Sequence, residues 1–172
     1  MGGTMKKITS NSKKIAICLC FKTEAQEAAK YYVSIFKNSK ITNTSYYGEA
    51  VAKGAGMRKG SVLAVTFQLN GQEFMALNGP DFKYTPAVSI MIPCKDQKEL
   101  DYYWNKLSAG GDKNAQMCGW LKDKYGVSWQ VFPALMTEIL KDKNIARADR
   151  VLAALSQMKK LDLKTLEKAY RS

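Results

Sequence analysis

The segment "AKYYVSIF", residues 29–36, has a second copy further along the chain, "LDYYWNKL" at residues 100–107. Both copies carry apolar residues at helical spacing, which indicates an amphipathic helix. A shift of 71 residues superimposes the two segments, and a pair of adjacent tyrosines occupies the same positions in each. Repetition of this kind indicates a duplicated structural unit, so the flanking segments should repeat as well.

Both predicted helices begin with the signal of a capping box, in which two side chains satisfy the first backbone N–H groups of a helix. Thr23 is followed three residues later by Gln26, and Asp96 by Glu99. We therefore predict one helix within residues 23–36 and a second within residues 96–107.

The flanking segments also repeat. The strand-like runs "IAICLCF" (15–21) and "AVSIMIPC" (87–94) precede the two helices. Three strand candidates follow each helix, at residues 40–47, 61–69 and 72–77 and at residues 112–118, 119–123 and 127–132. Asn70-Gly71 predicts a hairpin turn, and Gly126 ends the corresponding turn. The sequence thus predicts an α+β fold with two tandem βαβββ modules, residues 14–79 and 85–133, in a single domain spanning 14–133.

The remaining segments have simpler patterns. Residues 134–172 contain three short helical segments, which we predict to be a C-terminal helical extension. Residues 1–13 are basic and polar and predict a disordered tail. Residues 48–60, "GEAVAKGAGMRKG", predict a loop.

Composition excludes several classes of function. The chain has 172 residues and a net charge of +12, but its lysines are scattered, so we expect a solvated surface and no specific nucleic-acid partner. Its apolar runs are too short to span a membrane, and with no signal peptide we expect a cytoplasmic protein. The absence of histidine excludes Ser-His-Asp and Cys-His catalysis and zinc bound by histidine.

Strand alternation predicts which residues face a pocket. Ile15, Ile17, Leu19, Phe21, Val88, Ile90, Val127, Trp129 and Val131 should pack beneath the helices. The other face should carry Ala16, Cys18, Cys20, Met75, Leu77, Ala87, Ser89, Met91, Ser128, Gln130 and Phe132. An exposed sheet face would carry lysine and glutamate, so this mixture of soft and small polar groups indicates a concave ligand-binding site.

Individual roles at this site have alternatives. Gln130 and Ser89 are suited to hydrogen-bond a ligand, and Phe82, Trp120 and Phe132 to stack on it, although all three aromatic residues also suit a core or a dimer interface. Asn78 and Asp81 would stand at the rim, where a turn role is more typical. Asp81 is the one candidate for proton transfer. Cys18 and Cys20 suit a soft metal, although buried structural thiols are more common.

Beyond these patterns, the chain resembles the vicinal oxygen chelate (glyoxalase/bleomycin-resistance) superfamily. The resemblance is to its PhnB-like branch, which is labelled 3-demethylubiquinone-9 3-methyltransferase. It rests on "AAKYYVSIFKNSKI", "GQEFMALNGP", "FKYTPAVS" and above all "CGWLKDKYGVSWQVFP" (118–133), and it extends over residues 14–172. It implies that the two modules form one curved eight-stranded mixed sheet, and that the protein is a homodimer.

The resemblance also implies where a metal would lie. Metal-using relatives place His or Glu on the first and fourth strands of each half, at positions that correspond here to Cys18, Met75 or Leu77, Ser89 and Gln130. None of these is a hard-metal ligand, so we predict no metal and no cofactor.

We accordingly predict a metal-independent site for a small, anionic molecule. Two alternatives stay open: the methyltransferase activity of the family label, or a drug-sequestering dimer. If the protein is an enzyme, the resemblance implies a small-molecule lyase or transferase. Methyl donors of the nucleotide type favour glycine-rich turns of a doubly wound sheet, which argues against methyl transfer.

Overall fold

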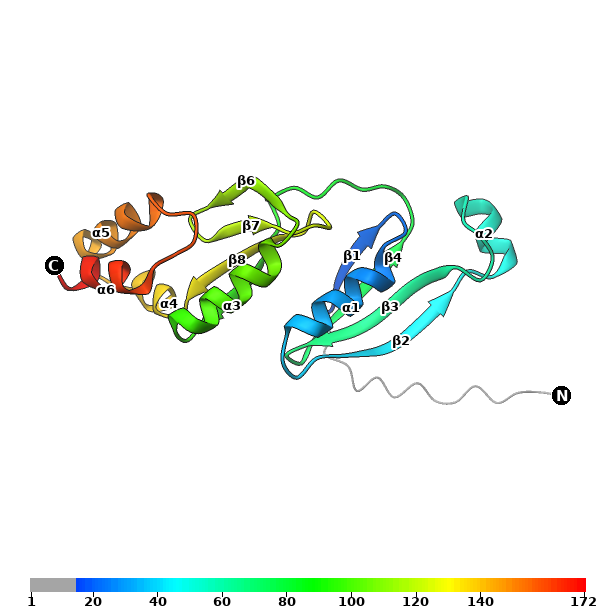
Figure 1. Cartoon of the computed structure of the whole chain (residues 1–172), viewed down its shortest axis with the longest axis horizontal. Helices are drawn as coiled ribbons and strands as arrows, with labels where there is room; N and C mark the ends of the chain where they lie inside the picture. The colour runs from blue at the N-terminus through cyan, green and yellow to red at the C-terminus, as the bar shows by residue number, and fades with distance from the viewer. Residues whose placement is uncertain (1–14) are drawn as a thin grey trace. The chain divides into compact units, whose positions relative to one another are not determined.

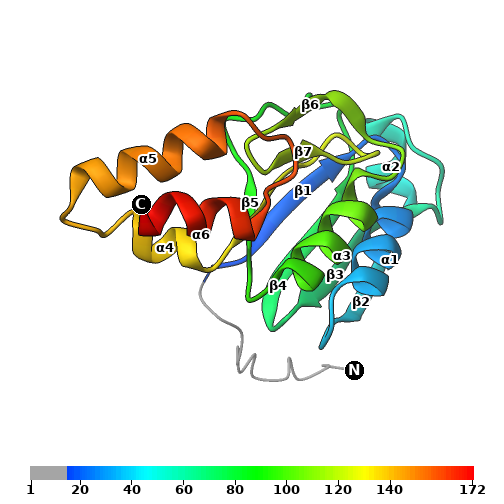
Figure 2. The same cartoon turned by 60° about the vertical axis from the view of Figure 1, so that its left-hand side comes forward.

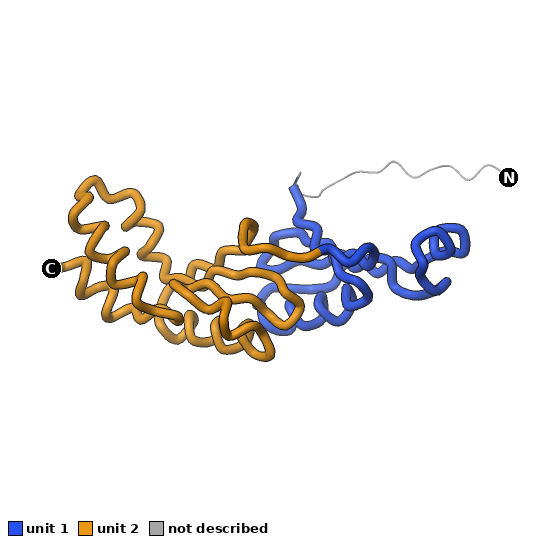
Figure 3. Tube along the Cα trace, turned by 90° about the horizontal axis from the view of Figure 1, so that it is seen from above, with its two compact units in different colours: residues 1–82 blue, residues 83–172 orange. Residues whose placement is uncertain are grey.

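The order strand–helix–strand–strand–strand occurs twice in the computed structural model, which describes residues 15–172, with one short extra helix between the second and third strands of the first copy. The chain divides into two compact units, residues 1–82 and residues 83–172 (Figure 3). The predicted tail at residues 1–13 lies outside the described residues.

Unit 1 contains a four-stranded sheet with the strand order β1-β4-β3-β2 (Figure 1). Strands β1 and β4 are parallel, and the other pairs are antiparallel. The hairpin between β3 and β4 turns at Asn70 and Gly71, which both have positive φ, as the Asn-Gly pair predicted. The elements are β1 (Ile17–Phe21), α1 (Ala25–Ile35), β2 (Lys40–Tyr46), α2 (Glu49–Ala55), β3 (Val62–Leu69) and β4 (Gln72–Asn78).

Unit 2 repeats this topology, with the strand order β5-β8-β7-β6 and a parallel β5–β8 pair. Three further helices follow its last strand, so the predicted α+β fold of two βαβββ modules with C-terminal helices is confirmed. The elements are β5 (Ile90–Cys94), α3 (Gln97–Ser108), β6 (Asp112–Met117), β7 (Trp120–Lys122), β8 (Ser128–Pro133), α4 (Leu135–Ile139), α5 (Ile145–Ser156) and α6 (Leu163–Arg171).

Each sheet is covered on one face by the helix of its own module. In unit 1, α1 lies across the sheet (Figure 2), and Tyr32 stacks on Phe67, which stacks on Phe74, with ring centroids 6.3 and 5.3 Å apart. In unit 2, Leu100, Trp104 and Leu107 of α3 are buried in the core that also contains Trp129 and Val131 of β8. The opposite face of each sheet, called here the distal face, carries the candidate site.

The two module helices begin differently. Asp96 caps α3 as predicted, by accepting a hydrogen bond from Glu99 N–H at 2.8 Å. The Glu99 carboxylate accepts from Lys95 N–H, one residue before the N–H that a capping box would use. The predicted cap at Thr23 is wrong, because α1 begins one residue later than that box requires. The first N–H of α1, on Ala25, is instead accepted by the side chain of Asn78 at 2.9 Å.

Three other local predictions are corrected. Ile15 and Val88 are 78% and 79% exposed, because both lie outside the paired parts of β1 and β5. Residues 48–60 are not a simple loop: they contain the short helix α2, which buries only Ala52.

The C-terminal extension is tied to α3. The Gln97 side chain donates to Leu161 C=O and accepts from Leu163 N–H at 2.8 Å, and Lys160 forms an ion pair with Asp101 at 2.7 Å. Val151 of α5 and Leu166 of α6 are fully buried. In the part of the chain that the structure describes, every helix is too short or too polar to span a bilayer.

Candidate functional site

The distal face of unit 1 is built from soft and small polar side chains. The register of the sheet places Cys18 beside Met75 and Thr66 in one row across β1, β4 and β3. The next row contains Cys20, Leu77 and Ala64. Leu19 and Phe21, which alternate with the cysteines, are buried beneath α1 as predicted.

The two cysteines of this face are accessible. Cys18 is exposed and Cys20 is partly buried, and none of the four cysteines of the chain forms a disulfide. The pKa of the Cys18 thiol is raised, first by partial burial and then by the charge and a hydrogen bond of Cys20 beside it. The two sulfur groups therefore interact directly on the surface of the sheet.

The distal face of unit 2 centres on Gln130. This residue lies in register with Met91 on one side and Trp120 on the other, so the three side chains form a row across β5, β8 and β7. Gln130 Nε2 donates a hydrogen bond of 2.7 Å to the Ser89 hydroxyl, just ahead of β5. Phe132 follows on the same face, in register with Pro93.

The sequence analysis missed Lys122. Leu121 is buried, so its neighbours Trp120 and Lys122 both point to the distal face. Lys122 is in register with Ser128 of β8 and with Asp112 of β6. The Asp112 carboxylate accepts a hydrogen bond from Asn114 N–H. Lys122 therefore places a cation on the same face, in the row next to that of Gln130 and Trp120.

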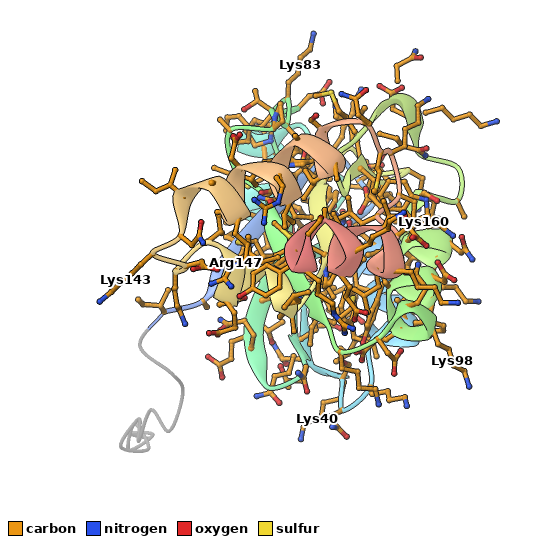
Figure 4. The ribbon with its side chains drawn as sticks, turned by 90° about the vertical axis from the view of Figure 1, so that its left-hand side faces the viewer. Lys40, Lys83, Lys98, Lys143, Arg147 and Lys160 are labelled. Atoms are coloured by element: carbon orange, nitrogen blue, oxygen red, sulfur yellow. The ribbon has the colours of Figure 1, made fainter. Side chains whose placement is uncertain are left out.

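Three other basic residues of unit 2 have different surroundings. Figure 4 shows Lys98 and Lys143 of unit 2 pointing outward on different sides. Arg147 is held by Asp142, with Nε–Oδ2 at 2.7 Å, and lies over the Tyr170 ring. Lys122 is the basic side chain that the register of β7 places on this face.

The residues predicted for the rim divide into two groups. Asn78 is only 3% exposed, and its amide both accepts from Ala25 N–H and donates to Val62 C=O, so it joins α1 to the sheet. Its backbone carbonyl also accepts from the Tyr47 hydroxyl at 2.7 Å. Asp81 and Phe82 are exposed in the segment that follows β4. A ligand role for these three residues stays a prediction.

The buried carboxylate of Asp123 stabilises the turn that joins the two strands of the site. Asp123 is 2% exposed at the β7–β8 turn. Its oxygens accept from the backbone N–H groups of Tyr125 and Val127 and from Trp129 Nε1, at 2.9, 3.0 and 2.8 Å. These hydrogen bonds hold the hairpin that carries Trp120, Lys122 and Gln130. The periodicity of the sequence did not predict the hydrogen bonds of Asp123.

The donor groups of both distal faces do not fit a hard divalent ion. Mg²⁺, Ca²⁺ and Mn²⁺ prefer charged oxygen ligands, whereas the register brings together thiol and thioether groups in unit 1 and amide and hydroxyl groups in unit 2. Within residues 15–172, no group of three or more His, Cys, Asp or Glu is placed to hold a metal. No step of a reaction is therefore assigned to a hard metal.

Comparison with known proteins identifies relatives. The model of the family described as 3-demethylubiquinone-9 3-methyltransferase matches residues 13–132. A PhnB protein from Bacillus cereus that carries this label is 36% identical, with a TM-score of 0.60, over 70% of this chain and 99% of that one. A comparison with the curated proteins finds no match.

More distant structures share the fold. The fosfomycin resistance protein FosX from Listeria monocytogenes is 19% identical, with a TM-score of 0.52, over 77% of this chain and 99% of its own. A protein from Pseudomonas aeruginosa is 17% identical, with a TM-score of 0.54, over 71% of this chain and 98% of its own. The family match ends before α4, so the C-terminal helices lie outside it.

Proposed function

This chain belongs to the 3-demethylubiquinone-9 3-methyltransferase family, in the PhnB-like branch of the vicinal oxygen chelate superfamily, and we propose that it binds a small aromatic anion without a hard metal. One observation carries the proposal. The distal face of unit 2 combines a hydrogen-bonded Gln130–Ser89 pair with Trp120 and Lys122 on the neighbouring strand.

Each group has a separate task in the proposed site. Lys122 supplies the charge that attracts a carboxylate or phosphonate. Gln130, whose orientation is fixed by its bond to Ser89, offers hydrogen bonding to a polar substituent. Trp120 and Phe132 are half-buried on the same face and offer flat surfaces for an aromatic ring.

Charge also supports this function over the capture of cationic drugs. The chain carries a net charge of +12, which repels a cationic ligand and attracts an anionic one. Asp112, beside Lys122, offsets part of this attraction locally. We therefore propose an anionic ligand, and a homodimer as the assembled form, as the family resemblance implies.

Methyl transfer, which the family label names, has less support. Nucleotide-type methyl donors bind where a glycine-rich turn leads from a strand into a helix. Here the turns from β1 to α1 and from β5 to α3 are Lys22-Thr23-Glu24 and Lys95-Asp96, which contain no glycine. We propose binding as the function and assign no catalytic residue.

Two probes of similar shape and opposite charge test the proposal. Phenylphosphonate and benzamidine are titrated separately into ¹⁵N-labelled protein, and the indole signal of Trp120 is followed by NMR. We expect phenylphosphonate to shift this signal, more weakly as salt is added, and benzamidine to leave it unchanged. Equal binding of benzamidine would contradict the proposed ligand charge.

Substitutions test which lysine contributes to the binding of phenylphosphonate. Lys122→Met should weaken phenylphosphonate binding by about tenfold, which corresponds to about 1.4 kcal/mol, and Asp112→Asn should strengthen it. Lys113→Met is the matched control, because Lys113 is an exposed lysine on β6. If Lys113→Met has the same effect as Lys122→Met, the binding reflects only the diffuse charge of the surface.

A further inference from the structure

Cys18 and Cys20 form a pair of thiols on the distal face of unit 1. The residue between them, Leu19, is buried beneath α1, so the two cysteines point to the same side of β1. Cys18 is exposed and Cys20 is partly buried. A structural role as buried packing thiols therefore does not describe this pair, whereas it does describe Cys94, which is 1% exposed.

The spacing of the pair favours a bridging ion over a disulfide. Residues two apart on a strand have Cα atoms separated by roughly 6.4–6.8 Å, at the upper limit of the range in which disulfides form. Two metal–sulfur bonds of about 2.3 Å span up to about 4.6 Å between the sulfurs. Because both thiols lie on the same side of β1, such an ion needs little rearrangement of the strand.

Met75 supplies a third soft donor. It is the register partner of Cys18 on the adjacent parallel strand β4, and its side chain is half-buried on the same face. Leu77 occupies the matching position beside Cys20 and gives that side of the pair an apolar neighbour. Two thiols and one thioether therefore lie on the same face of the adjacent strands β1 and β4.

This donor set selects among soft metals. Thiolate and thioether groups together favour Cu(I). Structural zinc requires four ligands, usually Cys or His, and within residues 15–172 no third His, Cys, Asp or Glu is placed with the two thiols. The set is therefore suited to Cu(I) and is incomplete for Zn²⁺.

The second module shows that the topology alone does not create this set. At the matching registers of β5 and β8, Met91 faces Gln130 and Pro93 faces Phe132, so no thiol is present there. The soft donors are a property of the sequence of unit 1.

We propose that unit 1 binds one Cu(I) ion through Cys18, Cys20 and Met75. The site is separate from the proposed anion site of unit 2, and neither proposal depends on the other.

Competition with a chromogenic Cu(I) chelator tests the site. The reduced 172-residue protein is added without oxygen to the complex of Cu(I) with bicinchoninate, and the loss of colour measures the copper that the protein removes. We expect about one equivalent for the unmodified chain. Cys18→Ser and Cys20→Ser should each abolish this transfer, and Met75→Leu should weaken it by roughly ten- to a hundredfold.

Cys118→Ser is the matched control, because Cys118 is a partly buried thiol on another part of the fold. It should remove as much copper as the unmodified chain. The far-UV circular dichroism of each variant shows whether it is folded. The proposal would be overturned if folded Cys20→Ser removed as much copper as the unmodified chain, or if Cys118→Ser lost copper transfer to the same extent as Cys20→Ser. It would also be overturned if one equivalent of Zn²⁺ prevented the transfer of copper to the unmodified chain.

Discussion

At the scale of single residues, the carboxylate of Asp123 holds the β7–β8 hairpin in shape. It is almost completely buried, and it accepts hydrogen bonds from two backbone N–H groups and from the Trp129 indole. A buried donor that loses its acceptor costs far more than an exposed one. The turn therefore depends on this side chain in addition to its backbone hydrogen bonds.

We expect Asp123→Ala to lower the free energy of unfolding by about 3 kcal/mol, because buried N–H groups lose their acceptor. Asp112→Ala is the control: Asp112 accepts a similar bond from Asn114 N–H, but it is exposed, and we expect a loss of less than about 0.5 kcal/mol. Urea denaturation measures both values. Similar losses in the two variants would contradict the structural role given to Asp123.

The cysteines differ in reactivity for a physical reason. Burial raises the pKa of Cys94 to about 12, with further contributions from Glu99 and Asp96. Because the thiolate is the reactive form, we expect iodoacetamide at pH 8 to leave Cys94 unmodified in the folded protein and to modify it in urea. Mass spectrometry of peptides measures this. Cys118, which is only partly buried, should be modified before Cys94, and modification of the two at the same rate in the folded protein would contradict the assignment.

At the scale of elements, alternation along strands predicted the faces well but not their limits. Leu19, Phe21, Trp129 and Val131 are buried as expected. Ile15 and Val88 are exposed although alternation predicted that they would be buried. The alternation of apolar residues in the sequence continues past the point where β1 and β5 have a neighbouring strand to pair with. Helix α2 escaped prediction for a related reason: with Ala52 alone buried, it has no apolar stripe to recognise.

The candidate site was predicted only in part. Gln130 and Ser89 were expected on one face, and the structure adds the bond between them. Lys122 and Asp123 were missed because lysine and aspartate near a turn normally face solvent. Only the register of β7 against β8 shows that Lys122 shares the distal face, and only the burial of the turn shows that Asp123 is structural.

The C-terminal helices should loosen in acid. The pKa of Asp101 is lowered by hydrogen bonds from Lys160 and Gln97, that of Asp162 by Thr165, and that of Asp142 by Arg147. A carboxyl whose pKa is lower in the folded than in the unfolded chain stabilises the fold at neutral pH, and this stabilisation is lost as the pH falls through the folded value.

We therefore expect the amide NMR signals of α5 and α6 to broaden below about pH 4, before those of β7 and β8. Gln97→Ala should move this change to higher pH, because it removes both a donor to Asp101 and the bonds to Leu161 and Leu163. Gln157→Ala, an exposed residue at the end of α5, is the control. Simultaneous change of all signals would show that the extension does not loosen separately.

At the scale of the whole molecule, the question is whether the two modules unfold together. Each has its own sheet and its own helix, but modules of this size bury too little surface to be robust alone. We therefore predict that residues 14–133 form one cooperative domain.

The distribution of tryptophan allows a direct test. All three tryptophans, Trp104, Trp120 and Trp129, are in unit 2, whereas Asn78, which joins α1 to the sheet, is in unit 1. We expect Asn78→Ala to lower the urea midpoint of tryptophan fluorescence as much as that of circular dichroism, by an amount equivalent to roughly 1–3 kcal/mol, since loss of the amide leaves buried groups unpaired. Asn43→Ala, an exposed change on β2, should leave both midpoints in place. A fluorescence midpoint that Asn78→Ala does not move would mean that unit 2 unfolds without unit 1, because a probe confined to one cooperative unit cannot respond to damage in another.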